Sequence, residues 1–125
     1  MSTWNHTELD AIGSAAELYI TTRRPDGTLR PPVPIWVVRA GDDIYVRSYR
    51  GRDGAWFRHA STQGTAHISA AGIDRDVTAT VPAEQVRAAI DDAYRAKYAR
   101  YGSTYTEAMT ADTAAGTTLR LAPAR

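Results

Sequence analysis

The stretch YVRSYRGRDGAWFR, residues 45–58, determines the predicted architecture, because it passes from a strand pattern through a loop into a helix pattern. Side chains alternate between two faces across residues 44–47, which is the period of a strand. Gly51 and Gly54 interrupt the alternation and predict a loop. Residues 53–62 then predict a short helix, whose aromatic side chains would cover a sheet edge or one end of a barrel.

The same stretch concentrates positive charge where the strand ends. Arg47, Arg50 and Arg52 fall within six residues, and Asp53 is the single acid of the stretch. A phosphate would gain charge-assisted hydrogen bonds from these arginines, with the Ser48 hydroxyl and the start of the following helix in support. A solvated surface loop with incidental arginines is the alternative interpretation. We expect an anion site here, because positive charges this close repel one another unless a bound anion neutralises them.

Upstream of this stretch, the pattern predicts a hairpin and a meander. Residues 18–21 alternate as a strand, and the Pro-Asp-Gly turn within residues 23–28 reverses the chain. The return run contains three prolines, so its start at residues 31–34 should lie at a sheet edge or bulge, whereas residues 35–38 predict a regular strand. A tight turn at residues 41–43 leads into the strand that ends at Ser48. We expect three strands in meander order, preceded by a short helix that Thr7 caps.

Downstream, the pattern predicts two more strands, a long helix and a last strand. The strands cover residues 65–69 and 73–81, and the helix begins at residue 82 and runs to about residue 100. Residues 117–123 alternate again. The predicted fold class is mainly β with helices (α+β): six antiparallel strands in a small barrel or curled sheet, a short helix after the third strand and a long helix near the C-terminus.

Composition limits the classes of partner and location. The 125 residues suit a single domain spanning residues 1–125. The formal net charge of +1 predicts binding to neither nucleic acid nor an anionic membrane. The N-terminal residues lack the basic and apolar segments of a signal peptide, and no stretch approaches a membrane span of about 18 apolar residues. Cysteine is absent. We expect a cytoplasmic protein.

The sequence lacks the motifs of several classes of enzyme. The histidines, His6, His59 and His67, have no metal-ligand spacing, and neither a serine-nucleophile motif nor a phosphate loop is present. We therefore predict no metal site and assign no catalytic residue.

The tryptophans allow more than one interpretation. Trp36 needs a hydrogen-bond partner if it is buried, and it either lines a pocket or belongs to the core. Trp56 is interpreted as a core or subunit-interface residue, with ligand stacking as the alternative.

Three segments carry a resemblance to a known superfamily. They are DGTLRPPVPIWVV (residues 26–38), DDIYVRSYRGRDGAWFR (residues 42–58) and AYRAKYARYG (residues 93–102). Together they resemble the FMN-binding split β-barrel superfamily, which includes pyridoxamine-phosphate-oxidase-like proteins and deazaflavin-dependent reductases. More closely, the chain is similar to a family of small, mostly actinobacterial proteins placed beside that superfamily. The resemblance implies a split β-barrel and a homodimer with the cofactor in a groove at the subunit interface.

The resemblance also implies a function and a set of binding residues. The function is that of an oxidoreductase that binds FMN or a deazaflavin coenzyme and transfers hydride to a small organic substrate. The alternative is a cofactor-free split-barrel protein that binds a small molecule or catalyses a biosynthetic step in the same cavity, with His67 or a tyrosine as its polar group. A nucleic-acid or protein-binding module is disfavoured by the near-zero net charge. Cofactor contacts are assigned to Arg47, Ser48, Arg50, Arg52, Pro34, Ile35, Trp36 and Trp56, and substrate contacts to Tyr98 and Tyr101.

Overall fold

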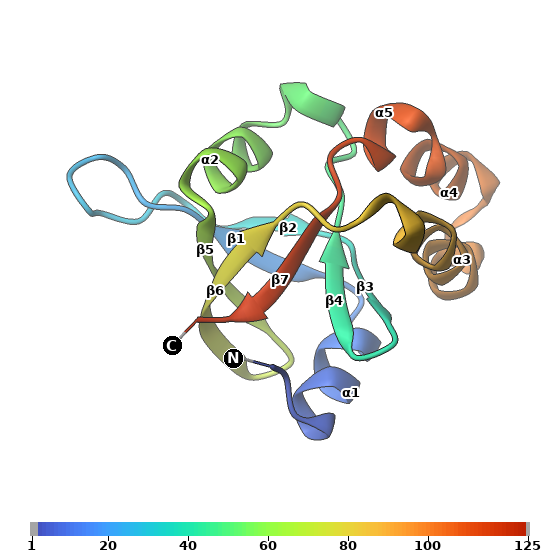
Figure 1. The fold of residues 1–125 in the computed structure, drawn as a ribbon, viewed down its shortest axis with the longest axis horizontal. Helices are drawn as coiled ribbons and strands as arrows, with labels where there is room; N and C mark the ends of the chain where they lie inside the picture. Colours follow the sequence, from blue (N-terminus) through green and yellow to red (C-terminus); the bar gives the residue numbers. More distant parts are fainter. Residues whose placement is uncertain (1–2, 125) are drawn as a thin grey trace.

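An antiparallel sheet curls into a nearly closed split barrel in the computed structural model, which describes residues 3–124 (Figure 1). The α+β class is confirmed, although the sheet in these residues has seven strands where the sequence predicted six. Its order is β2-β1-β5-β6-β7-β4-β3. The strands are β1 (Leu18–Thr21), β2 (Val33–Ile35), β3 (Val37–Ala40), β4 (Asp43–Val46), β5 (Thr65–Ala70), β6 (Ile73–Thr80) and β7 (Leu119–Pro123).

The additional strand arises from a break at Trp36. The predicted strand 35–38 is divided, because β2 ends at Ile35 and β3 begins at Val37. β2 pairs with β1 at one edge of the sheet, and β3 pairs with β4 at the other. The predicted three-strand meander is therefore wrong: the chain forms two hairpins and crosses from one edge to the other at Trp36. The proline-rich β2 does lie at an edge, as predicted, where the missing N–H groups cost no ladder hydrogen bond.

The helices lie around the barrel, with α2 at one end and α3, α4 and α5 together beside β3 and β4 (Figure 1). The predicted long helix is divided into α3 and two short 3₁₀ segments, and a further helix follows Gly102. Asn5, not Thr7, caps α1, because its side chain accepts from the Glu8 N–H in a capping box. The α-helices are α1 (His6–Ser14), α2 (Ala55–Gln63), α3 (Arg87–Tyr98), α4 (Ser103–Thr110) and α5 (Asp112–Ala115); the 3₁₀ helices are η1 (Gly51–Asp53), η2 (Glu84–Val86) and η3 (Ala99–Tyr101).

Two apolar clusters hold the barrel and its helices together. The larger one fills the barrel with aliphatic side chains from its strands, and α1 and α2 close it. The second cluster lies between the barrel wall and the C-terminal helices. It consists of Val38, Tyr45, Ile90, Tyr94, Tyr98, Met109 and Ala114. No helix in residues 3–124 has the length and apolar character needed to cross a membrane.

Helix α3 supplies hydrogen bonds to the backbone where the chain crosses between edges. The Val37 N–H donates to Oη of Tyr98 at 3.0 Å, and this hydroxyl donates to the Ala16 carbonyl oxygen at 2.8 Å. Nζ of Lys97 donates to the Val37 carbonyl oxygen at 2.6 Å. Burial raises the pKa of Tyr98 to about 12 and lowers the pKa of Lys97 to about 8. The two side chains thereby satisfy the backbone N–H and C=O of Val37, the first residue after the chain crosses from one edge strand to the other.

Tyr98→Phe is expected to lower the free energy of unfolding by about 1–3 kcal/mol, because the substitution leaves the buried Val37 N–H without its acceptor. Urea unfolding of the two proteins measures the difference. Tyr101→Phe is the matched control, since Tyr101 is 44% exposed and the change in free energy of unfolding should stay within about 0.5 kcal/mol. Equal losses in both variants would show that the Tyr98 hydroxyl does not stabilise the crossing.

Candidate functional site

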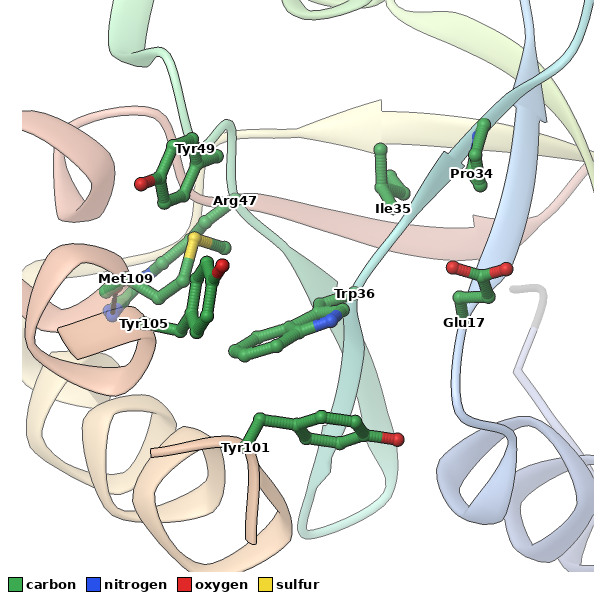
Figure 2. A pocket seen from close by; sticks show the side chains of 9 residues that line it. All are labelled: Glu17, Pro34, Ile35, Trp36, Arg47, Tyr49, Tyr101, Tyr105 and Met109. Atoms are coloured by element: carbon green, nitrogen blue, oxygen red, sulfur yellow. Dashed lines mark hydrogen bonds between the residues drawn. The ribbon is translucent and has the colours of Figure 1, made fainter. Parts of the chain in front are cut away.

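A cavity of about 450 Å³ opens where the two edges of the barrel meet. One side is formed by β2, the residue that precedes β1, and Trp36. The other side is formed by the segment that follows β4, by η3 and by α4, as Figure 2 shows. The lining residues are Glu17, Pro34, Ile35, Trp36, Arg47, Tyr49, Tyr101, Tyr105 and Met109.

Aromatic rings form much of the cavity wall. Trp36 stacks on Tyr98, with ring centroids 3.8 Å apart and planes 2° from parallel. The rings of Tyr101 and Tyr105 lie 5.6 and 6.2 Å from Trp36, and Tyr49 lies 6.4 Å from Tyr105. Because Tyr98 holds one face of the indole and three tilted tyrosines lie around the opening, the wall suits a flat, largely apolar ligand.

Arg47 lies at the buried side of the cavity and is 1% exposed. Its Nε donates to Oγ1 of Thr118 at 2.8 Å, and its Nη1 donates to Asp91 at 2.6 Å and to the Met109 carbonyl oxygen at 2.8 Å. Nη2 has no hydrogen-bond partner among the described residues. The guanidinium therefore connects the residue after β4 to α3, to α4 and to the residue before β7, and its charge is already balanced by Asp91.

The rest of the basic loop does not converge with Arg47. Ser48 is buried, and its N–H donates to Oγ1 of Thr117 at 2.8 Å, whereas Arg50 and Arg52 are exposed. None of these three residues lines the cavity. The expected four-residue cluster around one anion is thus absent from the described part of the chain. The reason is that Arg47, which directly follows β4, points into the helical layer, while Arg50 and Arg52 face solvent.

Of the other predicted contact residues, some line the cavity and some do not. Pro34, Ile35, Trp36 and Tyr101 line the cavity. Trp56 packs against the core inside the barrel, edge-on to Phe57, and does not line it. Tyr98 is fully buried behind Trp36, its hydroxyl is bonded to backbone groups, and it does not line the cavity.

Four lining residues were missed by the sequence analysis: Glu17, Tyr49, Tyr105 and Met109. Two of them had a detectable signal, because Tyr101, Tyr105 and Met109 recur at intervals of four residues, which places side chains on one face of a helix. By its local pattern, the segment of residues 103–109 predicts only an irregular or briefly helical stretch, and that pattern does not identify the face. Glu17 and Tyr49 carry no such signal, since only the folded barrel brings them to the cavity.

His67 lies away from the cavity, on β5. Its Nδ1 contacts Asp76 at 2.8 Å, and its Nε2 contacts Asp74. The hydrogen bond with Asp76 and then that with Asp74 raise the pKa of His67, against the opposing effect of burial. Residues 3–124 contain no group of three or more His, Cys, Asp or Glu side chains arranged to hold a metal ion. The histidine therefore forms a cross-strand charge cluster separate from the site.

The His67 cluster makes stability depend on pH in a defined direction. The pKa of His67 is higher in the folded state than in the unfolded state, so protonated His67 stabilises the protein at pH values below its unfolded-state pKa. This contribution to stability is lost as the pH rises through the folded-state pKa. Relative to His67→Gln, the natural chain should lose free energy of unfolding as the pH rises from about 6.5, the ordinary histidine pKa, through the raised pKa of the folded state. Urea unfolding across that range measures it.

His59→Gln is the control for this dependence, because burial and then Arg30 and Arg58 lower the pKa of His59. The natural chain should therefore gain stability relative to this variant as pH rises. A His67→Gln variant whose pH profile parallels that of the natural chain would contradict the assignment.

Comparison with known proteins places the chain in a family. The family described as "Uncharacterized protein conserved in bacteria (DUF2255)" matches residues 8–121, and the chain belongs to it. No curated protein gives a significant match.

Two solved structures share the fold. An FAD and heme binding protein from Mycobacterium smegmatis is 19% identical, with a TM-score of 0.54 over 98% of this chain and 67% of that one. An FAD-binding protein from Mesorhizobium loti is 13% identical, with a TM-score of 0.55 over 98% of this chain and 92% of that one. At these identities the likeness concerns the fold, and it supports the split-barrel assignment.

Proposed function

We propose that this member of the bacterial family binds a flavin in the cavity between the barrel edges and acts as a flavin- or deazaflavin-dependent oxidoreductase. The observation that carries the proposal is the aromatic-walled cavity itself, which lies in a barrel whose structural relatives include two FAD-binding proteins. A flavin ring is flat, largely apolar on its faces and polar along one edge. The wall offers the matching surfaces.

The residues present fit such a ring. The cavity volume of about 450 Å³ lies within the range of roughly 300–1,000 Å³ that is usual for small-molecule sites. Trp36 offers a planar surface already fixed by Tyr98. Polar groups stand at two places on the wall: Arg47 has an unused donor, and Glu17 offers a carboxylate acceptor. A ring that carries both a carbonyl and an N–H along one edge can use such groups.

When bound, a flavin supplies the hydride-transfer chemistry itself, and the protein supplies binding, orientation and electrostatics. In this chain Trp36 and Tyr105 would orient the ring and exclude water from its faces. Tyr49 and Tyr101 would restrict the opening, since they stand half-exposed at the cavity. No side chain needs to act as a nucleophile, which agrees with the lack of a nucleophile motif in the sequence.

The basic loop offers a place for a flavin phosphate outside the cavity. Arg50 follows Tyr49, which lines the cavity, and both Arg50 and Arg52 are exposed and available to an anion. The Arg50→Ala/Arg52→Ala variant is expected to bind FMN about tenfold more weakly, because exposed charge-assisted contacts contribute modestly.

Riboflavin, which lacks the phosphate, is the matched ligand for that comparison. Its affinity should be the same for the natural chain and the double variant, as fluorescence titration with each ligand will measure. If the variant loses affinity for riboflavin and FMN equally, the loop does not hold the phosphate.

Direct titration tests the proposed function. The purified protein is mixed with riboflavin, FMN, FAD or a deazaflavin coenzyme, and flavin absorbance and fluorescence are recorded. We expect saturable binding at micromolar concentration, and then reduction of the bound ligand by a nicotinamide donor or its reoxidation by an acceptor. Failure of every flavin to bind would refute the proposal and favour the cofactor-free small-molecule protein that the sequence also allowed.

The proposal includes a homodimer, which the superfamily resemblance implies. Apolar side chains remain exposed on the β1–β2 side of the barrel, where Tyr19 is 45%, Leu29 44% and Val33 37% exposed. Val33 precedes three residues that line the cavity, so a partner covering this side would also shelter the site. Mass measurement in solution tests the assembly, and a monomeric mass would remove this part of the proposal.

A further inference from the structure

The unused nitrogen of Arg47 is the starting observation. Its side chain is fully buried, two of its three guanidinium nitrogens are engaged, and Nη2 has no partner among the described residues. A buried donor without an acceptor is unfavourable, so the site is incomplete without a ligand or a water molecule. Arg47 and Met109 both line the cavity, on the side that α4 forms (Figure 2). The unpartnered donor therefore belongs to a residue of the cavity wall, and Nη2 itself is closed to solvent until a neighbouring side chain moves.

The electrostatic surroundings determine which acceptor fits. Asp91 lies 2.6 Å from Nη1 and is itself 14% exposed, so the buried guanidinium already has its counter-ion. The neighbouring charges also cancel, because Arg87 contacts both Asp91 and Asp112. An added anion would create a buried negative charge with no balancing cation, whereas a neutral carbonyl oxygen accepts the hydrogen bond and adds no charge.

We propose that the ligand of this cavity presents a neutral carbonyl oxygen to Nη2 of Arg47, and that free carboxylates and phosphates are excluded from this position. The inference rests on the proposed function in using the same cavity, and it specifies which end of the ligand enters. A carbonyl-bearing ring edge enters toward Arg47, and any anionic group stays outside. The side chain of Met109 shifts to admit the carbonyl, because its unbranched thioether adapts easily while Nη1 holds its backbone oxygen.

A matched pair of probes tests this selectivity in the natural chain. Benzamide and benzoate have the same ring and nearly the same size, but at neutral pH the first is neutral and the second is an anion. We expect benzamide to bind at least about tenfold more tightly, measured by titration while following the Trp36 indole N–H in NMR spectra. Benzoate binding as tightly as benzamide, or binding of neither probe at millimolar concentration, would overturn the proposal.

Asp91→Asn is the variant that should reverse the preference. The amide keeps the shape of the carboxylate and its hydrogen-bond acceptor but leaves the Arg47 charge without a counter-ion. Benzoate should then bind more tightly than benzamide and should raise the melting temperature of the variant, an increase that the natural chain should not show. Asp112→Asn is the matched control, since Asp112 is 94% exposed and its loss should leave the natural preference unchanged. If Asp91→Asn does not fold, the probe pair on the natural chain decides the question.

Flavin titration of the same preparations separates this inference from the proposed function. If the protein selects benzamide but binds no flavin, the flavin proposal fails and the carbonyl site stands. If flavins bind but the probes show no preference for the neutral ligand, the carbonyl site fails and the flavin proposal stands.

Discussion

Asp91→Ala is expected to lower the free energy of unfolding by about 3–5 kcal/mol, the largest effect that we expect from a single substitution. Arg47 would keep its charge in a position where its side chain has no exposure to solvent. The remaining hydrogen bonds, to Thr118 and to the Met109 carbonyl oxygen, satisfy donors but bring no negative charge. A buried charge that loses its counter-ion carries a large desolvation cost.

Urea unfolding of Asp91→Ala and Asp112→Ala makes the comparison. The control removes an acid of the same type from the same group of charges, but Asp112 is 94% exposed and should contribute less than about 1 kcal/mol. Replacing both partners, as in Arg47→Met with Asp91→Leu, should recover much of the loss, because no buried charge then remains. A loss below about 1 kcal/mol for Asp91→Ala would show that water reaches Arg47.

Trp36→Ala is expected to weaken flavin binding by about ten- to a hundredfold. Stacking of a planar base on an aromatic side chain contributes about 1–3 kcal/mol, and we expect a flavin ring on Trp36 to gain a similar amount. The indole is pre-organised by Tyr98, so a ligand does not have to order it. The substitution also removes the Tyr98 contact, so unfolding must be measured beside affinity and the titration limited to folded protein.

Trp56→Ala is the control for this prediction. Trp56 was assigned to the cofactor site from the sequence, but it packs on the barrel core and does not line the cavity. Its loss should lower stability and leave the affinity of the folded protein unchanged. If Trp56→Ala weakens binding as strongly as Trp36→Ala, the flavin lies outside the cavity described above, and the earlier assignment would be restored.

Local chemistry made most of the fold predictable. Pro25, Asp26 and Gly27 favour a turn independently of the surrounding structure. Gly27 adopts the positive φ of +89° that such a turn requires. The alternation in residues 18–21, 65–69 and 73–81 predicted strands that the structure contains, with boundaries shifted by no more than one residue. The class, the antiparallel strands and the helix after the third predicted strand follow from signals that extend over a few residues.

The crossing at Trp36 could not be predicted from local sequence signals. Residues 35–38 have the composition of one continuous strand, and nothing local distinguishes the hairpin partner of Ile35 from that of Val37. The division becomes favourable only when barrel closure brings both edges together and α3 offers Tyr98 and Lys97 to the buried backbone groups of Val37. Those two side chains lie about sixty positions farther along the chain.

The sequence by itself therefore determined the strands, the turns and a concentration of arginines beside Ser48, because each depends on neighbouring residues. Only the tertiary structure decided what the arginines do: it buries Arg47 against Asp91, leaves Arg50 and Arg52 in solvent, and gathers the cavity wall from segments far apart in the chain. The physical reason is that burial and charge pairing depend on which distant groups share a volume, and spacing along the chain does not encode that.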